Sequence, residues 1–187
     1  MPSYKFRVLI DTVNGEEIFR DIAMPGKDNF ESFYNTIIKA FGFRGDQMGS
    51  FYVSNESWDR GHEITLLDMR MNEDQEGLSI MKDTPLSTFV EEKGQRLVLV
   101  YDFLKMWCFM IECVDIRKET VKSPKVELVA GEAPAEDSKE ADPAADPNFG
   151  ASAELGEDFD DIFSDFDEDD PLDGGEAFDN PEGIDEY

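Results

Sequence analysis

The sequence predicts an α+β domain, a mixed β-sheet with two helices packed on one face, followed by a disordered acidic C-terminal tail. Two observations predict the domain. Apolar residues alternate or run continuously in six short segments, as in strands, and they recur at helical spacing in two others. A third observation predicts the tail, because residues 131–187 hold 22 of the 44 acidic residues but only one of the 17 basic residues. The order of elements is compatible with a β-grasp-like topology.

A β-hairpin is predicted at the start of the chain. The alternating apolar residues are Phe6, Val8 and Ile10 in its first strand and Ile18, Ile22 and Met24 in its second. Asn14-Gly15 lies between them, and both residue types tolerate the positive φ that a type I′ turn requires. Pro25-Gly26 ends the second strand.

The first predicted helix follows the hairpin. Asp28 or Asn29 can cap its N-terminus, and Gly42 stands where a helix commonly ends. Its apolar residues recur at helical spacing and are Phe30, Phe33, Ile37 and Phe41. We expect this stripe to pack on the apolar face of the hairpin.

Two short strands are predicted next, at residues 51–53 and 63–69, with a polar loop between them. Thr84-Pro85 then predicts the start of a second, short helix, since it offers a capping hydroxyl followed by proline at the first helical position. Gly94 would end this helix.

The last two strands are predicted to form the centre of the sheet. Residues 97–100 are a continuous apolar run, which is typical of a strand buried on both faces, and residues 107–116 form a longer strand after a tight connection. Cys108 and Cys113 are five residues apart in that second strand. They should therefore point to opposite faces as free thiols.

The domain is predicted to span residues 3–120, followed by a flexible linker at 121–150 and a disordered acidic tail at 151–187. Residues 130–148 are rich in Ala, Pro, Glu and Asp and have no apolar period, which is typical of a solvated linker. Within the tail, a short helix is predicted at 158–167. It would carry an apolar stripe of Phe159, Ile162, Phe163 and Phe166.

Three segments carry a resemblance to a known family. They are the strand Tyr-Lys-Phe-Arg-Val at 4–8, the helix at 30–42 that ends in Ala-Phe-Gly-Phe, and Val-Leu-Val-Tyr-Asp-Phe at 98–103 followed by Trp107. They resemble the plasmid pRiA-type ORF-three-like family, also described as TnpR-like passenger proteins of insertion elements. The resemblance covers about residues 4–117 and implies a compact α+β fold with no established catalytic activity. The family's Gly-Asp-Gly turn before the tryptophan is replaced here by Leu104-Lys105-Met106.

A ligand-binding site is one interpretation of Trp58, His62, Asp102 and Trp107. An acidic residue at a strand end with aromatic residues nearby suits a polar ligand. The alternative is structural. Tryptophan in an apolar strand usually lies in the core, and aspartate before a tight turn commonly accepts hydrogen bonds from backbone amides.

The sequence predicts no catalytic residues, no cofactor and no metal. The chain has one histidine, its two cysteines lack Cys-x-x-Cys spacing, and neither a phosphate-binding loop nor a Gly-x-Ser-x-Gly elbow is present. Part of the tail matches a calcium-loop template through Asp165, Asp167, Asp169, Asp173 and Glu176. Asp170 stands at the glycine position of that template and Pro171 follows it, so loose counterion association is the competing interpretation.

The charge balance indicates the class of partner. With a net charge of −27, the chain should repel nucleic acid and anionic membranes, so we expect no direct binding to either. A protein partner with a basic surface is favoured, whereas no feature favours any oligomeric state. The chain opens without a basic-then-apolar leader and has no run of about 20 apolar residues, which predicts a cytoplasmic location.

Three functional hypotheses follow. The first is a binding or adaptor module in which the acidic tail docks on a basic or apolar groove, either of its own domain or of a protein partner. The second is a small-ligand-binding protein or enzyme with a cleft near Asp102 and Trp107. The third is an acidic regulator or mimic that acts on a DNA-binding protein, whose complexes would dissociate steeply as salt rises.

Overall fold

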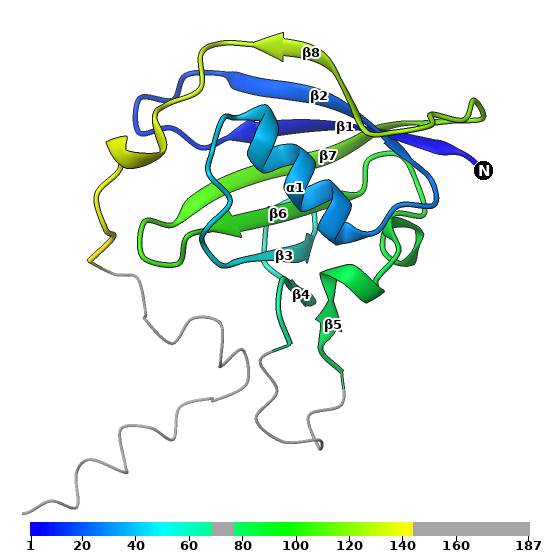
Figure 1. Cartoon of the computed structure of the whole chain (residues 1–187), viewed down its shortest axis with the longest axis horizontal. Helices are drawn as coiled ribbons and strands as arrows, with labels where there is room; N and C mark the ends of the chain where they lie inside the picture. Colours follow the sequence, from blue (N-terminus) through cyan, green and yellow to red (C-terminus); the bar gives the residue numbers. More distant parts are fainter. Residues whose placement is uncertain (69–76, 144–187) are drawn as a thin grey trace, which may run out of the picture. The chain divides into compact units, whose positions relative to one another are not determined.

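A computed structural model of the chain describes residues 1–68 and 77–143, which form one β-sheet with a helix on one face (Figure 1). Within these residues the sheet has eight strands in the order β5-β4-β3-β6-β7-β1-β2-β8. The strands are β1 (Ser3–Ile10), β2 (Ile18–Pro25), β3 (Gly49–Ser54), β4 (Glu63–Thr65), β5 (Ser79–Ile80), β6 (Arg96–Tyr101), β7 (Trp107–Arg117) and β8 (Lys125–Ala130). The helix is α1 (Phe30–Ala40), and three 3₁₀ turns are η1 (Met81–Asp83), η2 (Leu86–Thr88) and η3 (Glu136–Ser138).

The predicted hairpin is present, but its turn differs from the prediction. β1 and β2 pair antiparallel from Ser3 opposite Pro25 to Ile10 opposite Ile18. The connection therefore spans residues 11–17. Only Gly15 adopts a positive φ there, of 67°, and its N–H donates to the Thr12 carbonyl. Asn14-Gly15 is thus part of a longer loop rather than a two-residue type I′ turn.

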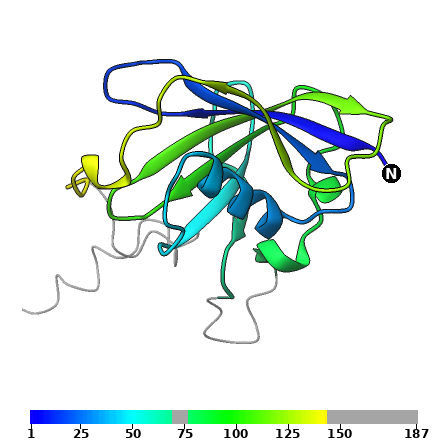
Figure 2. The same ribbon diagram turned by 45° about the horizontal axis from the view of Figure 1, so that its top comes forward.

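The first helix is confirmed. Asn29 is its N-cap, since its side-chain oxygen accepts a hydrogen bond of 2.9 Å from the Ser32 N–H. The buried side of α1 packs on the sheet, where the Phe33 ring centroid lies 4.4 Å from that of Phe6 and 5.6 Å from that of Phe51. Figure 2 shows α1 lying across this face of the sheet.

The second predicted helix is wrong, because the segment forms only the 3₁₀ turn η2. Its backbone groups are used in tertiary contacts instead. Leu86 donates its N–H to the Asp28 carbonyl, and the Thr84 carbonyl accepts from the Phe30 N–H. The Thr84 hydroxyl donates back to the Ile80 carbonyl at 2.7 Å rather than capping a helix. Residues 84–86 therefore pair with the start of α1.

The central strands β6 and β7 are confirmed as neighbours in the middle of the sheet. β1 pairs antiparallel with both of its neighbours, β2 and β7, whereas a β-grasp fold pairs its first strand in parallel with its last. The β-grasp-like topology is therefore not adopted. β4 and β5 pair in parallel, which makes the sheet mixed.

The segment predicted as a linker contains an ordered strand. β8 pairs antiparallel with the outer edge of β2, with Phe19 opposite Ala130 and Ala23 opposite Lys125. Most β8 side chains are exposed, and pairing with the outer edge of β2 makes this segment a strand. The order therefore continues past the predicted domain end at residue 120. The predicted tail helix at 158–167 lies outside the described residues.

Candidate functional site

The four residues predicted to line a ligand site do not share one cavity. Trp107 belongs to the apolar cluster under α1. Trp58 packs on the opposite face of the sheet with Val98 and Val100, and the Arg96 guanidinium lies 4.8 Å from its ring centroid. The single histidine, His62, lies directly before β4. Its Nε2 is 2.8 Å from the Ser79 hydroxyl, and its ring lies tilted against that of Phe89, with 4.9 Å between the ring centroids.

Asp102 organises the turn between β6 and β7. It is buried, it adopts a φ of 60°, and its carboxylate accepts hydrogen bonds from the N–H groups of Leu104 and Lys105 at 3.0 and 3.2 Å. Met106 also has a positive φ, of 55°. The turn thus uses the left-handed conformation without glycine, and the Asp102 side chain stabilises it.

Trp107 is almost completely buried, with 3 % of its surface exposed. One edge of its ring packs on Phe43 at 5.2 Å between centroids. Its indole N–H donates a hydrogen bond of 3.2 Å to the backbone carbonyl of Glu136. Trp107 therefore holds the end of the sheet to a segment that follows β8.

We name residues 131–143 the strap. The strap leaves β8 at Gly131, which has a φ of 76° and lies so close to Ile18 that a Cβ there would approach the Ile18 side chain to 2.9 Å. Within the strap, η3 lies beside the β6–β7 turn (Figure 1).

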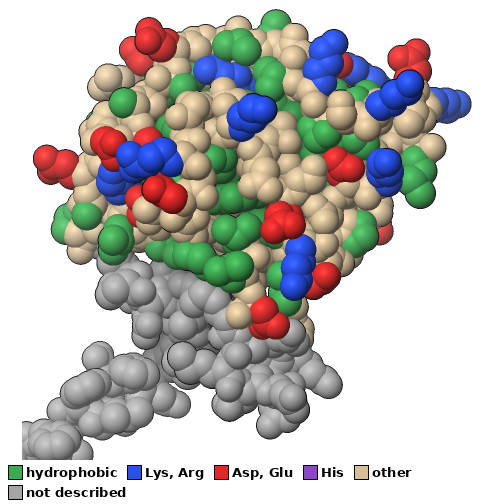
Figure 3. All heavy atoms as spheres, in the orientation of Figure 1, with side chains coloured by type: hydrophobic (Ala, Val, Ile, Leu, Met, Phe, Trp, Pro, Cys, Tyr) green, Lys and Arg blue, Asp and Glu red, His purple; other side chains and the backbone are tan. Residues whose placement is uncertain are grey.

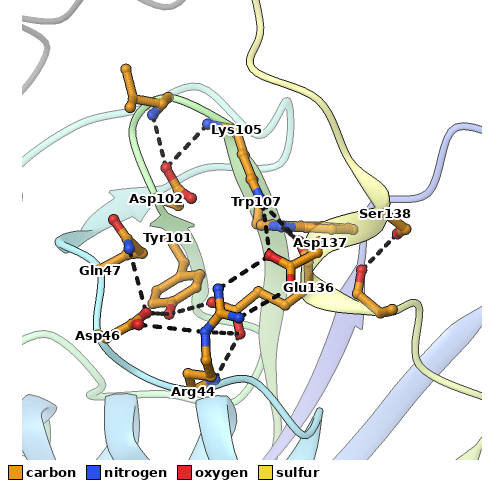
Figure 4. A network of polar contacts seen from close by, with 12 residues as sticks. Arg44, Asp46, Gln47, Tyr101, Asp102, Lys105, Trp107, Glu136, Asp137 and Ser138 are labelled. Carbon is orange, nitrogen blue, oxygen red and sulfur yellow. Dashed lines mark hydrogen bonds and ion pairs between the residues drawn. The ribbon is translucent and has the colours of Figure 1, made fainter.

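Glu136 anchors the strap. Its buried carboxylate accepts hydrogen bonds of 2.8 Å each from the Arg44 backbone N–H and the Tyr101 hydroxyl. Figure 4 shows Arg44 and Tyr101 converging on Glu136 from different elements. Burial first, and then the neighbouring Glu136 carboxylate, raise the pKa of Tyr101 to about 12.

Asp137 provides a second, exposed anchor. The Arg44 guanidinium bonds both of its carboxylate oxygens, at 3.0 and 3.1 Å, and the Lys105 ammonium lies 3.2 Å away. Arg44 first, and then Lys105, lower the pKa of Asp137. In the space-filling view, side chains of both signs gather at the left-hand end of the face that carries α1 (Figure 3).

A pocket of about 370 Å³ lies between the β1–β2 loop, Trp107 and the strap. We name it the Trp107 pocket. Its lining residues are Asp11, Thr12, Val13, Asn14, Glu16, Ile18, Trp107, Glu132, Pro134, Ser138 and Lys139. Three of these carry exposed carboxylates, whereas Lys139 contributes the one ammonium group in this lining. A pocket with an aromatic wall and an acidic rim can take a cationic group.

Lys139 contributes its own cation to the pocket. Its ammonium nitrogen lies 5.3 Å from the Trp107 ring centroid and donates a hydrogen bond of 2.6 Å to the Met106 carbonyl. The sequence predictions included Trp107 but missed Lys139 and the three carboxylates, because those residues lie in loops and in the predicted linker. One signal was present, since Lys139 is the single basic residue of 131–187.

A second, broader groove of about 730 Å³ runs between α1 and β8. Hydroxyl and amide side chains such as Ser32, Asn35 and Thr36 dominate its lining, and it is wide open. Across residues 1–68 and 77–143, no group of three His, Cys, Asp or Glu side chains is arranged to hold a metal ion. Over the same ranges, no helix has the length and apolar character that a bilayer crossing requires.

Comparisons with other proteins identify the family. No match is found among proteins of curated function. The fold is similar to the crystal structure of a protein of unknown function, MM3350 from Methanosarcina mazei Go1, with a TM-score of 0.60 and 22 % identity. The match covers 74 % of this chain and 75 % of that one. The family model described as plasmid pRiA4b ORF-3-like protein matches residues 2–146, and this chain therefore belongs to that family.

Proposed function

We propose that this protein is a non-catalytic binding module for a basic protein partner, and that its Trp107 pocket receives one lysine or arginine side chain. The observation that supports this proposal is the composition of the pocket. An indole forms its wall, and the carboxylates of Asp11, Glu16 and Glu132 stand around it.

The size and charge of the pocket suit a single cationic side chain. Its volume of about 370 Å³ is at the small end of the usual ligand-pocket range, which extends from about 300 to 1,000 Å³. A cation over an indole face gains about 0.5–2 kcal/mol, and carboxylates at the rim add attraction that salt screens. Ile18, which is buried, supplies an apolar surface for the methylene stem.

A protein partner is favoured over a free small ligand because the pocket opens beside a protruding loop. Val13 at the tip of that loop is 95 % exposed, so it offers an apolar contact next to the pocket. The net charge of −27 would steer a basic partner toward the chain. The tail stripe at 159–166 lies outside the described residues and remains a predicted second contact.

Titration of the full-length chain with capped tripeptides tests the proposal. Gly-Arg-Gly and Gly-Lys-Gly supply the cation, and Gly-norleucine-Gly supplies the stem without the charge. The chain has two tryptophans, so its indole N–H spectrum reports Trp107 beside an internal control, Trp58, on the opposite face. We expect the cationic peptides to shift the Trp107 signal and leave Trp58 unchanged.

Charge variants identify the site. Asp11→Asn and Glu132→Gln should each weaken binding of Gly-Arg-Gly about two- to fivefold, as for other exposed ion pairs of up to about 1 kcal/mol. Glu91→Gln removes an equal charge from an exposed position away from the pocket and should leave affinity unchanged. An equal response to the norleucine peptide, or an unshifted Trp107 signal, would overturn the proposal.

A further inference from the structure

We infer that Lys139 is a built-in competitor that occupies the cation position of the Trp107 pocket and is displaced when a partner's lysine or arginine enters. This inference rests on the proposed function and describes how the same site is regulated.

The position of Lys139 is the one that a guest cation would take. Its ammonium lies 5.3 Å from the Trp107 ring centroid and bonds the Met106 carbonyl at 2.6 Å. A guest ammonium or guanidinium needs the same two partners, an aromatic face and a carbonyl oxygen. The guest cation and the Lys139 ammonium cannot both occupy this position, because Trp107 is the one aromatic residue among the described residues that line the pocket.

Lys139 can leave without release of the strap. Glu136 and Asp137 hold the strap through separate contacts, namely the Arg44 N–H, the Tyr101 hydroxyl and the Arg44 guanidinium. The Trp107 indole N–H adds a fourth contact, to the Glu136 carbonyl. None of these involves the Lys139 side chain, which is long and regains rotamer freedom when it moves into solvent.

The exchange predicts a preference among guests. An arginine guanidinium is planar and can stack on the indole while it donates to the Met106 carbonyl, whereas a lysine merely replaces Lys139 with an equivalent group. Arginine should therefore displace Lys139 more effectively than lysine does. While no guest is bound, the Lys139 ammonium also offsets the negative charge of the carboxylates at the rim.

Removal of the Lys139 charge tests the inference. Lys139→Met retains most of the apolar stem and removes the charge. Gly-Arg-Gly should bind this variant about three- to tenfold more tightly than it binds the native chain, because the resident cation no longer competes. Lys139→Arg restores a cation at this position, so this variant should bind Gly-Arg-Gly no more tightly than the native chain does. Lys122→Met removes an equal charge from an exposed position and controls for the change in net charge.

The outcomes separate this inference from the proposed function. If Gly-Arg-Gly binds the native chain with the expected dependence on Asp11 and Glu132, but Lys139→Met binds equally or more weakly, Lys139 is a structural residue and only this inference fails. If Gly-Arg-Gly shifts Trp107 in neither the native chain nor Lys139→Met, both proposals fail. If Lys139→Met binds Gly-Arg-Gly more weakly, urea unfolding shows whether this variant has lost its folded structure. In that case the affinity of Lys139→Arg for Gly-Arg-Gly, relative to the native chain, provides the test.

Discussion

The hydroxyl of Tyr101 donates a hydrogen bond of 2.8 Å to the buried carboxylate of Glu136, 35 residues further along the chain. This bond joins the end of β6 to the strap, and the Arg44 N–H donates a second hydrogen bond to the same carboxylate. The strap forms one wall of the Trp107 pocket, so the pocket depends on a contact that no local sequence pattern encodes.

Loss of the Glu136 carboxylate should destabilise the fold and free the strap. Glu136→Ala removes the acceptor of the Arg44 N–H and leaves the Tyr101 hydroxyl with a longer contact, of 3.5 Å to Asp46. We expect the free energy of unfolding to fall by about 1–3 kcal/mol. Asp137→Ala is the control, since its exposed ion pairs are worth about 1 kcal/mol or less. Urea unfolding measures both. Equal, small effects of the two variants would show that Glu136 is not the main anchor.

The protein should lose stability in alkali. Burial raises the pKa of Tyr34 and of Tyr52, and that of Tyr101 to about 12. The unfolded chain ionises its tyrosines near pH 10, before the folded chain does, so stability is retained below that pH and falls as pH rises through the interval toward 12. Urea midpoints recorded across this interval should decrease, and Tyr101→Phe should flatten the decrease. A slope that is unchanged in Tyr101→Phe would exclude Tyr101 as a contributor.

Asp21 should contribute stability that acid removes. Its nearly buried carboxylate accepts two hydrogen bonds from Arg7, at 2.8 and 3.0 Å, and the pKa of Asp21 is lowered first by Arg7 and then by Lys5. This contribution is complete above the unfolded value near pH 4 and disappears as pH falls through the lower folded value.

Substitution of that carboxylate gives the measurement. Asp21→Asn should lower the free energy of unfolding by about 1–3 kcal/mol at neutral pH, because hydrogen bonds to a charged group are lost. The difference from the native chain should shrink below about pH 4. Glu17→Gln, at an exposed position on the same hairpin, should change stability little at either pH. A difference for Asp21→Asn that is constant with pH would contradict the assignment.

Asn29 should stabilise both α1 and the contact of α1 with the segment before η2. Its side-chain oxygen caps the helix by accepting a hydrogen bond from the Ser32 N–H, and its side-chain nitrogen donates to the Lys82 carbonyl at 2.7 Å. Asn29→Ala loses both and should lower the free energy of unfolding by about 1–2 kcal/mol. Asn29→Asp keeps the cap but loses the donor to Lys82, so we expect an intermediate value. If Asp and Ala are equivalent, the cap contributes nothing measurable.

Several elements could be predicted because their signals are local. The cap at Asn29 and the stripe from Phe30 to Phe41 predict α1 from neighbouring residues alone, and the apolar runs predict β6 and β7 at the sheet centre. The same reasoning gave the wrong result at Thr84-Pro85. The helix signals there are real, but the backbone of residues 84–86 is bonded to the start of α1. Tertiary hydrogen bonds overrode the local preference.

By itself, the sequence determined the family, from segments spread over most of the domain. It also determined the apolar face of the hairpin, α1 and the central strands, since each of these elements depends on a pattern within about a dozen residues. Only the tertiary structure decided that β8 joins the sheet and that Lys139 lies over Trp107. The reason is physical. β8 needs the open edge of β2, and the pocket needs Asp11, Trp107 and Lys139, whose proximity arises from pairing across more than a hundred residues of chain rather than from any periodicity.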